Sequence, residues 1–171
     1  MSESKVSPSE PPSRRVDQEP PPVQASLTLT SFMVGAASFA VDVRDTLQVA
    51  EPGPVTPLPR APAHILGLTL VGSRAVAVLD LARFLELPES DEPPLDAAPR
   101  IVLCKSGALE AAIPCQRVEI LADLPDKEVM PPRLAEGDRF RRFCRAEIQR
   151  DDRVVSVIDI VALLEAARVQ R

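Results

Sequence analysis

The sequence predicts a mainly β protein made of two similar small β units that pack on a shared hydrophobic interface, with short helices that include one at the C-terminus. Short runs of apolar and β-branched residues alternate with turns and loops marked by glycine and proline, which is typical of strands. The run RAVAVLDLARFLE at residues 74–86 also returns without a gap as RVVSVIDIVALLE at residues 153–165. This repeat predicts two units that are each too small to bury a core alone.

The N-terminal residues 1–25 differ in composition from the rest of the chain. They hold six of the nineteen prolines, mixed with Ser, Glu and Arg and only scattered valines. Such a segment cannot bury enough apolar surface to fold, so we expect a disordered tail before one folded region at residues 26–168. The tail is either a solubilising extension or a tether, and the sequence does not separate these roles.

The first unit is expected to begin with a β-hairpin, in which LTLTSFMV and SFAVDV flank a turn that contains Gly35. A single helical turn is predicted around residues 44–47. The next segment, EPGPVTPLPRAP, holds five prolines in twelve residues. Since proline fixes φ and cannot donate a backbone hydrogen bond, this segment is expected to be an extended or turning loop.

Two strands and a helix complete the first unit. Residues 65–71 and the run RAVAVLD, which ends at Asp80, are rich in apolar and β-branched residues, and LARFLEL has apolar residues at helical spacing. The polar, proline-rich stretch at residues 88–99 then marks a boundary. The two units are therefore expected at about residues 27–87 and 100–166, although interleaved strands are also compatible with the sequence.

The second unit is expected to repeat this order. RIVLCK and LEAAIPC flank the turn residues SGA and predict a hairpin, although the alanines alone would favour a helix. DLPDKEVMPPRLAEGD predicts a loop, and RFRRFCRAEIQR predicts either a strand or a short helix followed by a strand. VVSVIDI predicts a strand and VALLEAARVQ the C-terminal helix.

An aspartate closes the strand in each copy of the repeat, Asp80 in the first and Asp159 in the second. Paired carboxylates can act as a general acid and base, so these residues are candidates for catalysis. An aspartate that runs straight into a helix is explained more simply as an N-cap that accepts backbone N–H bonds. We therefore expect two helix caps. The other identical pairs are Arg74/Arg153, Val76/Val155, Val78/Val157, Leu85/Leu164 and Glu86/Glu165.

No residue pattern points to catalysis, a metal or a cofactor. The chain has one histidine, His64, and a lone histidine lacks the partners that a metal site or an activated nucleophile needs. Cys104, Cys115 and Cys144 are odd in number and lack CxxC spacing, so they are expected to be reduced and mostly buried. Nucleotide-binding and hydrolase motifs are missing as well. A binding module without an active site is the expectation.

The formal charge of −5 argues against nucleic acid as a partner, since phosphate contacts need a basic surface. The N-terminus carries charges and prolines where a signal peptide has its apolar centre. The longest apolar run, at residues 65–71, is far shorter than the ~20 residues of a membrane-spanning helix. A cytoplasmic protein without direct membrane insertion is expected.

Three runs resemble the first half of CheW-like domains in order, spacing and residue type: SFAVDVRDTLQV, VTPLPRAPAHILGL and RAVAVLDLARFL. The second half, with IVLCKSGALEAAIPCQRVEIL and RVVSVIDIVALL, is similar to the second unit of the family more loosely. The resemblance covers about residues 27–166. It implies two SH3-like five-stranded β-barrels and a non-enzymatic adaptor of bacterial chemosensory signalling.

The resemblance also implies partners. One barrel of such adaptors docks on the regulatory domain of a CheA-type histidine kinase, and a hydrophobic groove between the barrels receives the signalling tip of a methyl-accepting chemoreceptor. Other CheW-like domains are further candidate partners. The protein would then be recruited from the cytoplasm to receptor arrays.

The family pattern places the partner-binding residues in two segments: Thr46, Gln48 and Val49 after the first hairpin, and Leu70, Val71, Gly72 and Ser73 between the next two strands. The second segment replaces the family's usual Asn-Leu-Arg-Gly, so Gly72 stands where the family has an arginine. Gln48 stands where glutamate is frequent.

A charge-assisted contact of the kind that arginine provides is worth roughly 1.5–3 kcal/mol, so these differences leave two functions open. The chain is either a receptor–kinase coupler or a divergent module that has lost receptor coupling and serves localisation or regulation in motility, polarity or development. In the coupler, replacing Gly72 by arginine is expected to strengthen binding to a typical receptor tip. The apolar residues Val49, Leu70 and Val71 are alternatively part of the core.

Overall fold

The computed structural model describes residues 27–88, 98–133 and 139–168. The predicted N-terminal tail and most of the predicted boundary at residues 88–99 lie outside these ranges. The strands are β1 Leu29–Val34, β2 Ala37–Asp42, β3 Thr46–Ala50, β4 Ile65–Val71, β5 Arg74–Leu79, β6 Arg100–Ser106, β7 Leu109–Leu121, β8 Val129–Met130, β9 Cys144–Arg150 and β10 Arg153–Ile158. The helices are α1 Leu81–Leu85 and α2 Ile160–Ala167, with 3₁₀ turns η1 Val43–Asp45, η2 Asp126–Glu128 and η3 Phe140–Arg142.

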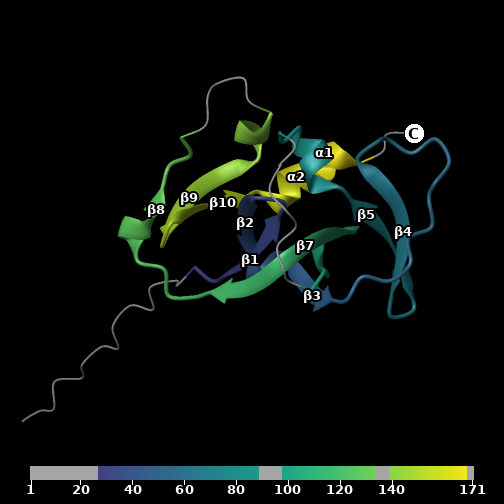
Figure 1. Cartoon of the computed structure of the whole chain (residues 1–171), viewed down its shortest axis with the longest axis horizontal. Helices are drawn as coiled ribbons and strands as arrows, with labels where there is room; N and C mark the ends of the chain where they lie inside the picture. The colour runs from purple at the N-terminus through teal and green to yellow at the C-terminus, as the bar shows by residue number, and fades with distance from the viewer. Residues whose placement is uncertain (1–26, 89–97, 134–138, 169–171) are drawn as a thin grey trace, which may run out of the picture.

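The predicted mainly β fold is confirmed, and the strands form two sheets that share the long strand β7 (Figure 1). Sheet 1 runs β3–β6–β7–β5–β4 and uses the first half of β7. Sheet 2 runs β7–β1–β2–β10–β9–β8 and uses the second half of the same strand. A bulge opposite Ser31–Met33, where Arg117 has a φ of 43°, separates the two halves of β7.

The two halves of the sequence are interleaved in the sheets. Hairpin β1–β2 comes from the first half of the chain, yet β2 pairs in parallel with β10 from the second half. Sheet 1 in turn combines β3, β4 and β5 with hairpin β6–β7. Each copy of the repeat therefore lies in a different sheet, β5–α1 in sheet 1 and β10–α2 in sheet 2.

The local predictions are largely confirmed. Both glycine-turn hairpins form, β1–β2 and β6–β7, and the alanines of β7 extend as a strand because β1, β5 and β6 all pair with it. Asp80 Oδ1 accepts the N–H of Arg83 at 3.0 Å, and Asp159 Oδ1 accepts the N–H of Ala162 at 3.0 Å. Both aspartates are thus helix caps.

Two local predictions differ from the structure in their extent. The single helical turn expected around residues 44–47 is present as η1, but it ends at Asp45 because strand β3 begins at Thr46 and pairs with β6. The loop expected at residues 123–138 contains η2 and strand β8, which pairs with β9 over Val129 and Met130. In both places a tertiary partner extends a backbone that carries little strand signal of its own.

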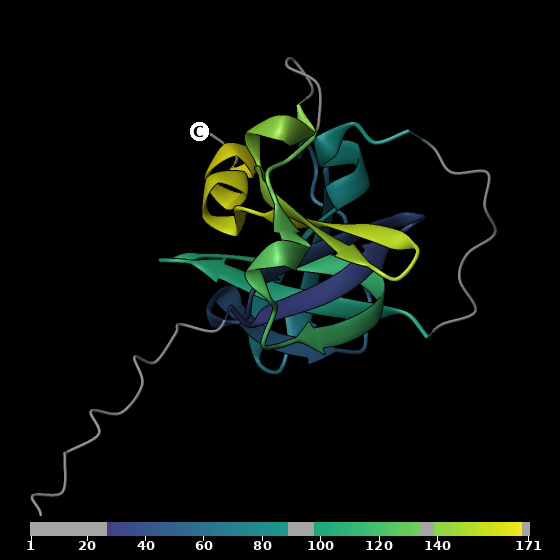
Figure 2. The same ribbon diagram turned by 90° about the vertical axis from the view of Figure 1, so that its left-hand side faces the viewer.

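The two sheets and both helices share one large core. Its members come from strands of both sheets and from α1, α2 and η3, among them Phe32, Phe39, Leu79, Phe84, Ile113, Phe143 and Leu163. A smaller cluster lies within sheet 2 and another within sheet 1. Figures 1 and 2 show α1 and α2 together beside the sheets, where they cover this shared core. The shared interface expected from the repeat is confirmed.

Candidate partner-binding surfaces

His64 has a structural role in this fold. Its Nε2 atom lies 3.3 Å from the carbonyl oxygen of Ala167 at the end of α2, and its ring packs edge-on against Phe84. Within residues 27–88, 98–133 and 139–168, no three His, Cys, Asp or Glu side chains come together in a way that could hold a metal ion. His64 therefore joins the segment before β4 to the C-terminal end of α2.

All three cysteines are buried and unpaired, as expected from the sequence. Burial raises the pKa of Cys104 to about 12 and that of Cys115 to about 12. Burial also raises the pKa of Cys144, whose Sγ donates to the carbonyl oxygen of Ala146. These thiols are neutral at physiological pH, whereas a nucleophile must be a thiolate.

The first candidate surface, here called the η1–β3 surface, consists of Val43, Leu47, Gln48 and Val49. The three apolar side chains are 37–40% exposed, and Gln48 is exposed as well. Leu47, Gln48 and Val49 are exposed because β3 lies at the edge of sheet 1 and pairs only with β6, and Val43 lies in η1 directly before this strand. Val43 and Leu47 were not predicted from the sequence, and the exposure of Leu47 follows from the position of β3 at the edge.

The predicted residue Thr46 supports this surface from below. Its hydroxyl donates to Thr30 Oγ1 at 3.1 Å, and Thr30 is fully buried. Thr46 is itself only partly exposed. The contact ties the start of β3 in sheet 1 to β1 in sheet 2, so Thr46 fixes the surface rather than forming its centre.

An ion pair borders the η1–β3 surface. Arg44 Nε and Nη2 donate to the two carboxylate oxygens of Asp42 at 2.9 and 2.6 Å, and the backbone N–H of Arg44 also reaches Asp42. The side-chain hydrogen bonds from Arg44 lower the pKa of Asp42. Asp42 thereby caps η1, and Arg44 remains 83% exposed at the rim.

The second candidate surface, the β4–β5 surface, consists of Leu68, Leu70, Gly72, Ser73 and Ala75. Leu70 is 68% exposed, the highest value among the exposed large hydrophobic residues of the described chain. Cross-strand pairing sets Leu70 opposite Ala75, so both side chains stand on the same face. Gly72 turns the chain with a φ of 62°.

The predicted site residue Val71 does not belong to the β4–β5 surface. It is 7% exposed and packs in the core cluster of sheet 1 with Val76 and Leu103. Successive residues of a strand point to opposite faces, so Leu70 and Val71 separate into surface and core. Of the other predicted residues, Leu70, Gly72 and Ser73 come together here, and Gln48 and Val49 lie on the η1–β3 surface.

The proline-rich segment at residues 51–62, here called the strap, fixes the shape of the β4–β5 surface. Thr56 and Leu68 exchange two backbone hydrogen bonds of 2.8 and 2.9 Å, and Thr69 Oγ1 donates to the carbonyl oxygen of Pro54 at 3.0 Å. The strap approaches β4 so closely that only a glycine fits at Gly67. Between strap and strands lies a hollow of about 400 Å³, with Leu70 and Ala75 in its wall.

A third apolar feature lies where α2 meets sheet 1. A hollow of about 210 Å³ is lined mainly by apolar side chains from the strap, the strands and the helix, including Leu58, Ile65, Leu109 and Leu164. Its walls come from segments far apart in the sequence, which meet where α2 packs on β6 and β7.

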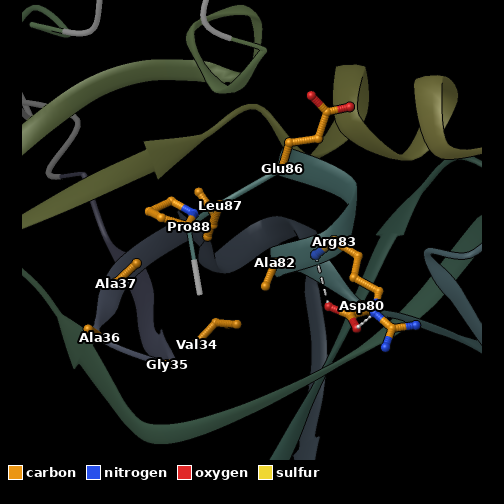
Figure 3. Close-up of a pocket in the computed structure, with 10 residues that line it drawn as sticks. All are labelled: Val34, Gly35, Ala36, Ala37, Asp80, Ala82, Arg83, Glu86, Leu87 and Pro88. Carbon is orange, nitrogen blue, oxygen red and sulfur yellow. Dashed lines mark hydrogen bonds and ion pairs between the residues drawn. The ribbon is translucent and has the colours of Figure 1, made fainter. Parts of the chain in front are cut away.

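A larger hollow of about 640 Å³ lies between the β1–β2 turn and α1 (Figure 3). Val34, Ala36 and Ala37 approach it from the turn, and Ala82 and Leu87 from the helix side. Asp80, Arg83 and Glu86 stand at its rim, with Arg83 Nε paired to Asp80 Oδ2 at 3.2 Å. Apart from Asp80, which the sequence offered as a candidate for catalysis, none of these residues was predicted as a site.

Two interlocked sheets with several exposed apolar surfaces are features of a protein-interaction module, and the capping aspartates and His64 make structural contacts. A model of the CheW-like domain matches residues 28–168, and the chain belongs to this family. It is a non-enzymatic scaffold of the chemotaxis type. Within the described residues, no helix is long and apolar enough to cross a membrane.

Relatives and a solved structure agree with this assignment. Protein FrzA of Myxococcus xanthus is 30% identical over 139 residues, which cover 80% of this chain and 84% of the relative. A probable chemotaxis protein CheW of Rhizobium etli is 23% identical over 82% of this chain and 88% of its own length. The scaffolding protein TtCheW of Thermoanaerobacter tengcongensis has the same fold, with a TM-score of 0.67 at 17% identity over 88% of this chain and 93% of its own.

Proposed function

We propose that this protein couples a CheA-type histidine kinase to chemoreceptors, as a cytoplasmic adaptor that is recruited to receptor arrays. The observation that carries the proposal is the presence of two separate exposed apolar surfaces on one rigid core. The η1–β3 surface begins where β2 ends, and the β4–β5 surface surrounds the turn after β4. Interfaces of adaptors use such apolar centres with polar rims.

The β4–β5 surface is proposed to receive the regulatory domain of the kinase. The exposed Leu70 side chain and the hollow beside it offer an apolar anchor, and the strap gives the hollow a fixed shape. An anchor residue in a preformed pocket is the usual centre of binding energy. Other CheW-like domains are a second class of partner for this same surface.

The η1–β3 surface is proposed to receive the receptor's signalling tip. Val43, Leu47 and Val49 supply apolar area, and Arg44 and Gln48 supply a polar rim. A helical hairpin can lay an apolar stripe on a surface of this kind. The proposal thus assigns one partner to each surface.

The test is to measure binding of the full chain to the regulatory domain of its kinase and to a receptor signalling fragment by titration calorimetry. Leu70→Asp is expected to weaken kinase binding at least tenfold and leave receptor binding within twofold, because a charge in an apolar centre loses about 1.4 kcal/mol or more. Val49→Asp is expected to do the reverse. Val154→Asp, at another exposed valine of a strand, is the matched control.

The other candidate function, a divergent module without receptor coupling, is favoured by Gln48, which lies on the proposed receptor surface where the family often has glutamate. It predicts kinase binding with no receptor binding at micromolar concentrations. Retention of neither partner would contradict coupling as well as this alternative.

A further inference from the structure

A group of arginines gathers over α1 and η3. Arg139, Arg141 and Arg142 lie in or directly before η3, and Arg83 lies in α1. The side chains of Arg83 and Arg139 are 63% and 42% exposed, and Arg141 and Arg142 are exposed residues. The whole chain has a formal charge of −5, so this local positive charge is opposite in sign to the net charge of the protein.

Aromatic rings hold two of these arginines in place. The guanidinium carbon of Arg139 lies 5.0 Å from the centre of the Phe84 ring, and that of Arg142 lies 5.7 Å from the centre of the Phe143 ring. The two rings are buried and in contact, with centroids 5.5 Å apart. A guanidinium over a ring face keeps its N–H edges free to bind an anion, so these groups are oriented before any partner arrives.

The surface keeps an excess of positive charge after its own ion pairs are counted. Arg83 pairs with Asp80, and Arg139 Nη1 pairs with Glu86 at 2.5 Å. Arg141 and Arg142 form no ion pair with a carboxylate of the described residues. Among the described residues, these four arginines and the two carboxylates that pair with them carry a net charge of +2.

Two of the four arginines adjoin the large hollow between the β1–β2 turn and α1. Glu86, which binds Arg139, also stands at the rim of the hollow, and Arg83 is part of the same rim (Figure 3). Behind the rim the walls are apolar, with Val34, Ala36 and Leu87 among them. Cationic groups and an apolar recess therefore lie side by side.

We propose that the arginines and the hollow form one docking site for an acidic segment of a partner protein. The segment places an apolar side chain in the hollow and carboxylates against Arg141 and Arg142. Charge complementarity favours this occupant, because arginine forks pair with carboxylates through two parallel hydrogen bonds. Nucleic acid fits less well, since the rest of the chain is acidic and the surface has few free cations.

This site goes beyond the proposed coupling function because it is separate from both surfaces used there. The hollow lies at the turn end of hairpin β1–β2, whereas η1 follows the opposite end, where Leu29 pairs with Asp42. Strands of six residues separate these ends by about 20 Å. The β4–β5 turn likewise lies at the end of β5 opposite to α1. A third partner can therefore bind while both others are in place.

The probe for the test is a labelled peptide with two leucines between two runs of three glutamates, bound to the full chain at low salt and followed by fluorescence anisotropy. The double variant Arg141→Ser/Arg142→Ser is expected to bind at least about tenfold more weakly, because it removes both free cations. The control Arg60→Ser/Lys105→Ser removes the same charge elsewhere and is expected to change affinity less than twofold.

Two further arms test the hollow and the class of partner. Ala36→Trp fills the hollow from an exposed turn, and a peptide with serines in place of the leucines leaves it empty, so both are expected to weaken binding severalfold. The proposal is overturned by equal losses in the two double variants, by undiminished binding of the serine peptide, or by the absence of peptide binding. Tighter binding of oligothymidylate or of anionic phosphatidylglycerol vesicles would overturn it too.

Discussion

At the scale of single residues, backbone conformation at two glycines decides how the β4–β5 surface is built. Gly67 has a φ of 146°, and a Cβ at this position would overlap the carbonyl oxygen of Thr56. A Cβ at Gly72, with φ 62°, would meet nothing within 4 Å. Close packing against the strap therefore requires a glycine at position 67, whereas only the turn geometry favours a glycine at position 72.

Replacing Gly67 by alanine is expected to destabilise the fold by about 2–4 kcal/mol, because the strap must move away from β4. Urea unfolding of the full chain measures this loss. Gly35→Ala is the matched control, since Gly35 also has a positive φ but open space around it, and it is expected to cost only about 1 kcal/mol. Equal losses for the two variants would show that the strap does not press on β4.

Gly72→Arg restores the arginine that the family pattern has at this position. Since the β4–β5 surface is proposed to receive the kinase, this variant should tighten binding to the kinase regulatory domain about tenfold, the gain of one charge-assisted contact. It should also lower the unfolding free energy by about 1 kcal/mol, because an arginine adopts a φ of 62° less readily than glycine. Calorimetric titration against the kinase regulatory domain measures the gain, and unchanged affinity would argue that the kinase does not use this turn. A gain for a typical receptor tip instead, as the family resemblance implies, would move the receptor to this surface.

At the scale of elements, the two copies of the repeat place equivalent caps and ion pairs. Asp80 N–H donates to the carbonyl oxygen of His64, and Asp159 N–H donates to that of Phe143, at 2.8 and 2.7 Å. Arg74 pairs with Glu110 near one end of β7, and Arg153 pairs with Glu119 near the other. The capping aspartates thus join each strand to its helix and to the segment before the neighbouring strand.

The cap at Asp159 makes stability depend on pH. Burial raises the pKa of Asp159, but the N–H of Ala162 and the Arg145 side chain outweigh it, so the pKa is lowered from 3.8. The carboxylate therefore stabilises the fold above pH ~3.8, and this contribution is lost as the pH falls through the lowered value.

Asp159→Asn keeps a capping side chain but cannot titrate, so its unfolding free energy should fall less steeply than that of the wild-type protein between pH 4 and pH 2. Asp159→Ala should lose about 1 kcal/mol at neutral pH, where the asparagine variant loses less. Denaturant unfolding at a series of pH values gives both results. Parallel pH curves for the wild-type protein and the asparagine variant would show that titration of Asp159 does not contribute to the pH dependence of stability.

The local elements were predictable because their signals are local. Glycine turns between apolar runs predicted both hairpins, and an aspartate before apolar residues at helical spacing predicted both helix caps. Strands β3 and β8 were not predictable in this way, because they extend against β6 and β9 and carry few strand-forming residues of their own. Strict alternation along β4 would have separated Leu70 from Val71, and this signal was available in the sequence.

At the scale of the whole molecule, the sequence predicted the mainly β class and the shared core, but the pairing of the strands could not be read from it. The parallel contact between β2 and β10 joins residues more than a hundred positions apart. No local pattern encodes such a partner, since hydrophobic periodicity shows which face of a strand is buried but not which other strand pairs with it. Leu47 was missed as a surface residue for the same reason, because only the sheet order places β3 at an edge.

The sheet architecture explains how one small chain can hold two partners at once. Both surfaces belong to sheet 1, with the η1–β3 surface at its β3 edge and the β4–β5 surface at its other edge, and the paired strands β6, β7 and β5 between them fix the two surfaces relative to each other. A scaffold needs this rigidity, because partners held at a fixed spacing lose less freedom when the second one binds.

The most direct test of coupling is the mass of the complex formed when the full chain is mixed with the kinase regulatory domain and a receptor signalling fragment. Size-exclusion chromatography with light scattering measures it. The coupling proposal predicts one species that contains all three proteins, which loses the kinase domain with Leu70→Asp and the receptor fragment with Val49→Asp. Displacement of one partner by the other, so that only two-protein complexes form, would contradict it.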